Sequence, residues 1–365
     1  VGDNCGDILS AAHSGKLHYV GDSNTIAAAK ALLPKDATIL EFPKPPKADD
    51  KTVKVIRKET AMADALIAVG SGTLNDLCKY ASFLDSKPYS VIATAPSMNG
   101  YVSANASITV EGYKNTLPAH APTKVICDLD ILSNAPTQLI RAGIGDSLCR
   151  STVQADWLLS HLLLDTPYEP VYFDWLGEDE TRLLENPGDS EALINSLLLS
   201  GIAMREEGSS APASQAEHMI AHTMEMLNPS LPHSYHGEQI AITSLTMAKR
   251  QEALLAQDSV TVADLAGFAN LPLSLHKQAQ QQTAEKLPDD EAIEKLNKKL
   301  VQKWPTIREM ISHLCLPSEQ LERALNAAGC PIHPQDIGWD DTEYKKTVSL
   351  ARFTRNRFTF LDLSL

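Results

Sequence analysis

Short apolar runs alternate with amphipathic stretches through the first third of the chain. The runs at 17–20, 37–42, 65–70 and 89–94 have the length of strands, and the stretches at 25–33, 52–63 and 71–84 have the periodicity of helices. The run ALIAVG at 65–70 has no polar side chain, which is typical of a strand buried on both faces of a sheet. Strands and helices that alternate at this spacing predict βαβ units and a parallel sheet.

The pattern changes near residue 135. A hairpin is predicted over 106–117 and one more strand over 124–132, after which nearly every segment to Leu365 has helical periodicity. The sequence therefore predicts an α/β domain over 1–134 and an all-α domain of roughly eight to ten helices over 135–365. Prolines are expected to break those helices at Pro187, Pro229, Pro232, Pro272, Pro288, Pro305, Pro317 and Pro331.

Composition limits the classes of function. The 365 residues carry a formal net charge of −14, with 43% hydrophobic and 21% charged residues, which fits a soluble globular protein and disfavours non-specific binding to nucleic acid. The six cysteines are scattered without a CxxC pair, so reduced thiols and a cytoplasmic location are expected. No apolar run reaches the roughly 18–20 residues of a membrane span, and no signal peptide is visible. The chain begins at Val1 without a methionine, which fits a processed or trimmed N-terminus.

A glycine-containing turn follows the buried strand at 65–70. In VGSGTLND, Gly70 and Gly72 let the backbone approach a bound group, and Thr73 or Asn75 is expected to cap the next helix, whose N-terminus attracts phosphate. The turn differs from the dinucleotide fingerprint GxGxxG because Asn75 takes the place of the third glycine. From this turn alone, a plain strand-to-helix connection is an equal alternative.

A second polar turn, TAPSMNGYVS (94–103), follows the next predicted strand. It offers the side chains of Thr94, Ser97, Asn99 and Ser103. Because ligands of parallel sheets bind beyond the carboxyl ends of the strands, the two polar turns resemble the two walls of a cofactor cleft.

Histidines cluster between residues 218 and 236. His218 and His222 are four residues apart in a predicted helix, so both rings lie on one face, and His236 opens the next apolar run. Taken alone, histidines at this spacing are more often surface or core residues than ligands. HMIAH also differs from the zincin motif HExxH, because Met219 follows the first histidine. Two imidazoles need an acid to complete a divalent-metal site, and Asp146 in RAGIGDSLCR is the candidate.

The motifs together point to a known family. The segments VGSGTLNDLCKYASF, TAPSMNGYVSANASI, APTKVICDLDIL, RAGIGDSLCR, ADWLLS, PASQAEHMIAH and HGEQIA occur in this order over roughly residues 18–245. Through them the chain resembles the glycerol-1-phosphate dehydrogenases, within the superfamily of iron-containing alcohol dehydrogenases, glycerol dehydrogenases and dehydroquinate synthases. The similarity is strongest to the bacterial branch typified by the arabinose-operon type enzyme. The resemblance implies a dehydroquinate synthase-like fold, with a Rossmann-like variant of the parallel sheet.

The resemblance also implies roles for single residues. Asp146, His218 and His236 match the three metal ligands of the family, and His222 matches a histidine that contacts substrate. Asp146 and His222 are thereby the expected catalytic residues. Asn99 stands where the family usually has an aspartate that contacts substrate, and His120 stands where relatives usually have lysine. An asparagine keeps a hydrogen-bonding carbonyl and loses the charge, so the identity of the substrate stays open.

A nicotinamide dinucleotide is the cofactor that the resemblance implies. The residues expected to contact it are Asp22, Gly70, Gly72, Thr73, Leu74, Asn75, Asp76, Thr94, Ala95, Pro96, Ser97 and Ser103. Asp22 would favour NAD over NADP if it points at the ribose, because it would repel a 2′-phosphate. The metal is open among zinc, nickel and iron.

The expected activity is hydride transfer between dihydroxyacetone phosphate and sn-glycerol 1-phosphate. The metal would lower the pKa of the substrate hydroxyl, and His222 would relay the proton. The expected partner is a small phosphorylated polyol or ketose, and relatives are often dimers, so a homodimer or higher oligomer is expected. Two alternatives stay open. One is a glycerol or other polyol dehydrogenase, or a dehydroquinate synthase-like cyclase, on the same fold. The other is a non-catalytic dehydrogenase-like binding protein.

Overall fold

The computed structural model describes residues 5–110 and 113–364. The chain forms two compact units, one of residues 1–143 with 188–206 and one of residues 144–187 with 207–365. The segment 188–206 thus belongs to the first unit, although 44 intervening residues of the chain belong to the second. The expected division of labour, with cofactor in the N-terminal domain and metal in the C-terminal domain, stays a prediction.

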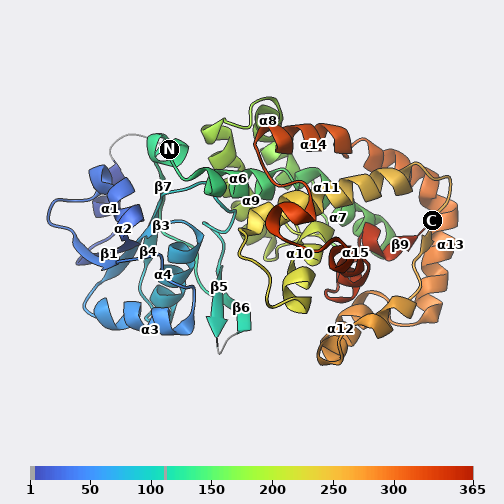
Figure 1. Cartoon of the computed structure of the whole chain (residues 1–365), viewed down its shortest axis with the longest axis horizontal. Coiled ribbons are helices and arrows are strands. Elements are labelled where there is room, and N and C mark those ends of the chain that lie inside the picture. Colours follow the sequence, from blue (N-terminus) through green and yellow to red (C-terminus); the bar gives the residue numbers. More distant parts are fainter. Residues whose placement is uncertain (1–4, 111–112, 365) are drawn as a thin grey trace. The chain divides into compact units, whose positions relative to one another are not determined.

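The first unit is built on a parallel sheet of five strands (Figure 1) in the order β2-β1-β3-β4-β7. The strands are Leu17–Asp22 (β1), Thr38–Phe42 (β2), Ala65–Gly70 (β3), Tyr89–Ala93 (β4) and Val125–Cys127 (β7). Pairing of β3 with β4 runs from Leu66 opposite Tyr89 to Gly70 opposite Ala93, so these two central strands end at the same edge.

Helices cover both faces of this sheet. The helices of the unit are Cys5–Ala12 (α1), Ser23–Ala28 (α2), Asp50–Glu59 (α3), Gly72–Leu84 (α4), Leu129–Ser133 (α5), Thr137–Ser147 (α6), whose last turn passes into the second unit, and Ser190–Glu207 (α9). Leu66 and Ala68 of β3 pack in a core with Ile56 of α3. Ile67 and Val69 lie in a separate core on the other face. Alternate residues of β3 thus enter two cores, which explains its unbroken apolar run.

The predicted hairpin is present, while the predicted strand over 124–132 is too long. Asn105–Val110 (β5) pairs antiparallel with Tyr113–Pro118 (β6), and the predicted tip at 111–112 lies outside the described residues. The strand β7 ends at Cys127, because the side chain of Asp128 accepts a hydrogen bond from Ile131 N and caps α5. The apolar pattern alone predicts a longer strand, and the N-cap aspartate ends it.

The second unit is helical. Its helices are Arg150–Leu164 (α7), Val171–Glu185 (α8), Ala216–Leu227 (α10), His236–Leu255 (α11), Leu273–Lys286 (α12), Asp290–Ser312 (α13), Ser318–Ala327 (α14) and Asp341–Leu350 (α15). A two-stranded ladder of Thr261–Val262 (β8) and Leu363–Ser364 (β9) is an addition that helical periodicity did not predict. The expected break at Pro305 is wrong, because α13 continues through it. Among the described helices, none has the length and apolarity to cross a membrane.

Candidate functional site

Three side chains of the second unit, each from a different helix, converge. Asp146 lies near the end of α6, His218 on α10, and His236 is the first residue of α11. One potential ligand atom from each residue lies within 4.8 Å of the other two, and His218 Nε2 is 3.6 Å from Asp146 Oδ1. Two ligand atoms at about 2.1 Å from one tetrahedral cation are themselves roughly 3.4 Å apart. The structure thus brings together the predicted ligands, at a spacing that one divalent cation fits.

Glu217 completes the surroundings of His218. Its Oε1 accepts a hydrogen bond of 2.8 Å from His218 Nδ1, and another of 2.7 Å from the Gln215 backbone N–H. Both Glu217 and His218 are buried. A proton held on Nδ1 leaves the Nε2 lone pair facing Asp146, which is the tautomer that a metal-binding histidine needs. Glu217 therefore fixes this imidazole in the form that binds a cation.

The charge on His218 follows from the same neighbours. Burial by itself lowers the pKa of His218, but hydrogen bonds and charges from Asp146 and Glu217 outweigh burial and raise the pKa above its ordinary value. The two carboxylates thus create a position where positive charge is stabilised, whether a proton or a metal ion supplies it.

A second group of ligand types is less suited to a metal. Cys149, Glu217 and His218 also have atoms within 4.8 Å of one another. Burial raises the pKa of the Cys149 thiol well above its ordinary value, and the thiol donates a hydrogen bond to the Asp146 carbonyl oxygen at 3.1 Å, so its sulfur is already engaged. His218 Nδ1 is also occupied by Glu217. Asp146, His218 and His236 are therefore the better ligand set.

Glycine at 145 permits the close approach of α6 to α11. A Cβ atom on Gly145 would lie 2.1 Å from the Gly237 carbonyl oxygen and 3.0 Å from Ala241 Cβ. Gly145 precedes Asp146 and Gly237 follows His236, so this helix contact lies beside two of the three candidate ligands. The packing of two helix backbones therefore sets the spacing of the ligand set.

His222 lies one helical turn beyond His218, next to an arginine. Its ring centroid is 6.0 Å from that of His218 and 5.4 Å from that of His236. Arg355 Nη2 lies 3.1 Å from His222 Nδ1. Because a guanidinium only donates hydrogen bonds, His222 Nδ1 accepts, and the neutral ring carries its proton on Nε2. His222 is thereby prepared to donate a hydrogen bond from Nε2.

In the first unit, the two predicted cofactor turns follow adjacent strands. Thr94 N–H donates to the Gly70 carbonyl at 3.2 Å, so the starts of both turns are hydrogen-bonded together. A Cβ atom on Gly70 would lie 2.5 Å from Leu74 Cδ1, which explains the need for glycine there. The prediction that Thr73 or Asn75 caps α4 is wrong, because the helix begins earlier, at Gly72, with Ser71 as its N-cap. The first N–H groups of α4 lack acceptors within the helix, as at any helix N-terminus.

A buried lysine holds the second turn. The Nζ atom of Lys79 donates to the carbonyl oxygens of Gly100 (2.8 Å) and Asn105 (3.0 Å) and to Ser103 Oγ (3.1 Å), and it lies 3.5 Å from Asp76 Oδ1. Burial lowers the pKa of Lys79, and Asp76 partly offsets this. Ser103 and Asp76, both predicted cofactor contacts, are thus tied to one cation that the sequence analysis did not single out.

Three other sequence candidates have structural partners. Asp22 Oδ1 accepts hydrogen bonds from the N–H groups of Asn24 and Thr25 and so caps α2. His120 Nε2 lies 2.9 Å from Ser82 Oγ, and its ring stacks on Tyr89. The backbone of Asn99 packs against α9, where a Cβ on Gly201 would lie 2.5 Å from the Asn99 carbonyl oxygen. Any role of Asp22 or Asn99 in binding stays a prediction.

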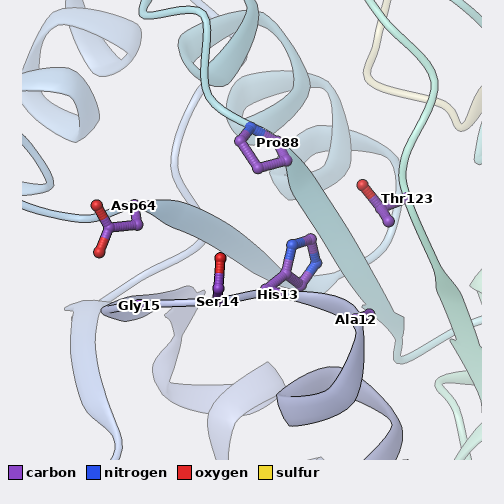
Figure 2. A pocket seen from close by; sticks show the side chains of 7 residues that line it. All are labelled: Ala12, His13, Ser14, Gly15, Asp64, Pro88 and Thr123. Carbon is purple, nitrogen blue, oxygen red and sulfur yellow. The ribbon is translucent and has the colours of Figure 1, made fainter.

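The first unit has a hollow of about 570 Å³. Figure 2 shows the side chains that line it, among them His13, Asp64, Pro88 and Thr123. Asp64, Pro88 and Thr123 precede β3, β4 and β7, so the hollow lies at the amino edge of the sheet. His13 Nε2 is 2.6 Å from Ser90 Oγ, and burial lowers the pKa of His13. Parallel sheets bind their ligands at the opposite, carboxyl edge. The glycine-containing turn after β3 and the polar turn after β4 lie at that edge.

Comparison with known proteins identifies the family. A model of the iron-containing alcohol dehydrogenases matches residues 21–136. Over 314 residues the chain is 30% identical to a glycerol-1-phosphate dehydrogenase (NAD(P)+) of Halalkalibacterium halodurans, and this alignment covers 83% of the chain and 71% of that protein. The chain belongs to the glycerol-1-phosphate dehydrogenase family. It is also 34% identical over 207 residues to a glycerol-1-phosphate dehydrogenase (NAD(P)+) of Thermococcus sibiricus. This alignment covers 54% of the chain and 58% of that protein.

Solved structures agree with this family at the level of the fold. A probable glycerol dehydrogenase from Sinorhizobium meliloti superposes with a TM-score of 0.61 at 18% identity, covering 96% of this chain and 87% of that chain. An iron-containing alcohol dehydrogenase from Corynebacterium glutamicum superposes with a TM-score of 0.59 at 14% identity, covering 98% of this chain and 93% of that chain. The predicted fold class, a parallel α/β part followed by a helical part, is confirmed.

Three residues of this family member were missed in the sequence. Glu217, Lys79 and Arg355 act through contacts that depend on tertiary structure, and none stands in a ligand-like spacing. The signal for Glu217 was its place directly before the candidate ligand His218. Arg355 is 133 residues from His222, and its position gave no signal.

Proposed function

We propose that this protein is a metal-dependent, NAD(P)-linked dehydrogenase that interconverts dihydroxyacetone phosphate and sn-glycerol 1-phosphate. The observation that supports this most is the convergence of Asp146, His218 and His236 in a chain of the glycerol-1-phosphate dehydrogenase family. One carboxylate and two imidazoles suit zinc, nickel or iron and leave further coordination positions open for substrate.

The residues around this site have separable tasks. When bound, the cation polarises the substrate oxygen and the nicotinamide supplies or accepts the hydride. Glu217 holds the Nδ1 proton of His218 and keeps Nε2 free to bind the cation. His222 donates a hydrogen bond from Nε2 to a substrate oxygen. A proton relay through His222, as expected from the sequence, would require its Nδ1 contact with Arg355 to change.

Cofactor binding is assigned to the first unit. The turns at 70–76 and 94–97 follow paired strands, and the N-terminus of α4 supplies N–H groups for a pyrophosphate. Lys79 donates a hydrogen bond to Ser103, the last residue of the second polar turn (94–103). Asp22 faces its own helix as an N-cap, so we base no preference between NAD and NADP on its charge.

The test is an activity assay combined with metal analysis. Purified protein should oxidise NADH or NADPH with dihydroxyacetone phosphate, and a chelator should stop the reaction until metal is restored. His218→Ala should lose bound metal and activity while keeping its helical circular dichroism. His313→Ala removes an exposed histidine and is the matched control, which should bind metal as the wild type does. Wild-type activity that survives both chelation and His218→Ala would refute the metal mechanism.

Asn99 favours testing a second candidate, a dehydrogenase of unphosphorylated polyols, because the residue differs from the family aspartate. Glycerol, dihydroxyacetone and their phosphates should be compared at equal concentration. Preference for the phosphorylated pair supports the proposed function, and preference for the free polyols supports the alternative. The product configuration, sn-glycerol 1-phosphate or 3-phosphate, should be determined with enzymes of known stereospecificity.

A further inference from the structure

Arg355 is a half-buried cation without an acidic partner. In the described part of the chain, no carboxylate lies within ion-pair distance of its guanidinium, which donates a hydrogen bond to His222 Nδ1. Neighbouring arginines differ: Arg352 pairs with Asp362, and Arg357 donates to the Ser214 carbonyl and to Ser210 Oγ. Burial lowers the pKa of Arg355, with no acid to offset the cost. Most donors of this guanidinium are therefore available to an anion.

The chain on both sides of Arg355 is fixed. Thr354 Oγ1 lies 2.9 Å from Thr223 Oγ1 of α10, in the turn that follows His222. Asn356 N–H donates to Gln282 Oε1 at 3.0 Å, and Asn356 Nδ2 donates to Glu285 Oε2 at 2.6 Å. These contacts hold the backbone of Arg355 against α10 and α12. The guanidinium is thus positioned before any ligand arrives, which lowers the entropy cost of binding one.

We propose that Arg355 binds the phosphate group of the substrate. The inference rests on the proposed function, because it assumes a substrate that carries a phosphomonoester. In dihydroxyacetone phosphate, one carbon and one oxygen separate the reacting carbon from phosphorus. A phosphate site must therefore lie close to the metal ligands, and Arg355 contacts a histidine whose ring stacks on that of His236. A guanidinium matches phosphate oxygens in charge and in its forked geometry.

The local charges also favour an anion here. Burial, and then the charge of Arg355, lowers the pKa of Arg357 to about 10, although the charge of Glu217 partly offsets this. Two cations that disfavour each other are stabilised by an anion near both. The chain has a net charge of −14, so a dianionic substrate needs such a local positive region to enter.

The experiment compares Arg355→Met with wild type on two substrates that differ in the phosphate group. The metal-loaded proteins are assayed with dihydroxyacetone phosphate and with dihydroxyacetone. In Arg355→Met, the ratio of the two kcat/KM values should shift against the phosphorylated substrate by about 10- to 100-fold, as expected for loss of a charge-assisted hydrogen bond. The KM for dihydroxyacetone phosphate should rise, and Arg355→Lys should recover part of the loss. Arg323→Met, which removes an exposed arginine of α14, is the matched control and should keep the wild-type ratio.

Inorganic phosphate gives an independent measurement. It should inhibit wild type competitively against dihydroxyacetone and bind by calorimetry, and Arg355→Met should lose at least about 10-fold in affinity. An unchanged substrate ratio in a folded, metal-containing Arg355→Met would overturn the role of Arg355 while leaving the proposed function intact. Absence of wild-type activity on dihydroxyacetone phosphate would instead reject the proposed function. In that case, equal phosphate affinities of wild type and Arg355→Met would overturn the inference as well.

Discussion

At the scale of single residues, buried carboxylates in the second unit differ in what neutralises them. Glu217 and Asp146 flank His218, where a proton or a cation supplies positive charge. Asp362 contacts Lys286 at 2.8 Å and Arg352 at 3.3 Å. Asp156 has no such cation among the described residues, and accepts backbone N–H groups from Phe360 (2.8 Å) and Ala216 (3.2 Å). Asp156 is therefore the carboxyl on which pH should act most directly.

Stability of the second unit should fall as pH rises, because of Asp156. Burial, with a contribution from the charge of Glu217, raises the pKa of Asp156 to about 8 from an ordinary 3.8. A raised pKa means that the folded state favours the protonated carboxyl, so this stabilisation is complete below about pH 4 and is lost as pH rises through 8. The slope for one proton is at most about 1.4 kcal/mol per pH unit.

The measurement is urea unfolding of metal-free protein between pH 5 and 8. All four tryptophans lie in the second unit, so their fluorescence reports on the unit that contains Asp156. At pH 5, Asp156→Asn should be less stable by about 1–3 kcal/mol, since it loses an acceptor for one backbone N–H. Its pH slope should nevertheless be shallower than that of wild type. Equal slopes in both proteins would show that Asp156 does not titrate in this range.

At the scale of elements, the contact of α6 with α11 should control metal binding. Gly145→Ala would place a methyl group 2.1 Å from the Gly237 carbonyl oxygen, so the two helices must separate. We expect a loss of about 1–3 kcal/mol in the free energy of unfolding from overpacking. We also expect weaker metal binding, because Asp146 and His236 move apart with their helices.

Metal titration and urea unfolding of Gly145→Ala test this effect. The control is Gly177→Ala in α8, where a Cβ atom meets nothing within 4 Å. Alanine there should be neutral or should stabilise the helix by up to about 1 kcal/mol. Wild-type metal affinity in Gly145→Ala would mean that the spacing of α6 and α11 does not set the ligand geometry.

The elements also show how far the sequence could predict the fold. Runs such as 65–70 were assigned correctly, because burial on both faces leaves an unbroken apolar pattern. Local exceptions were missed. The strand beyond Cys127 was replaced by a helix that Asp128 caps. Pro305 was expected to break a helix, but the carbonyl that it displaces belongs to Val301, whose side chain is 75% exposed, so the released carbonyl is on the solvent side.

The candidate site was predictable to a different degree. Asp146, His218 and His236 were found from residue type, helical spacing and family motifs. Lys79, Glu217 and Arg355 were not, because a lysine, a glutamate and an arginine have many roles on helix surfaces. Their surroundings became specific only when distant segments were brought together, as with Arg355 and His222. Sequence patterns thus predicted the candidate ligands, and the structure identified the groups that contact and position them.

At the scale of the whole molecule, the excess of acidic residues limits how substrates can be recognised. With a net charge of −14, long-range electrostatics oppose phosphate and dinucleotide ligands. The favourable charges are local: the helix N-terminus of α4 in the first unit, and Arg355 with the cation of the proposed metal site in the second. Raised salt should therefore weaken substrate binding less than it would for a protein that relies on a basic surface.

The two binding functions should be separable by hydrogen exchange, because their residues lie in different units. A ligand that binds only the folded state suppresses local opening around its site. Zinc or nickel alone should slow exchange near Asp146, in the segment 216–224 and at the start of α11. NADH alone should slow exchange at 70–76 and 94–103. His218→Ala should lose the metal-dependent protection and keep the protection by NADH, since His218 belongs to the second unit and the cofactor turns belong to the first. Protection by metal that persists in His218→Ala, or that appears at 70–76 instead, would place the cation elsewhere in the chain.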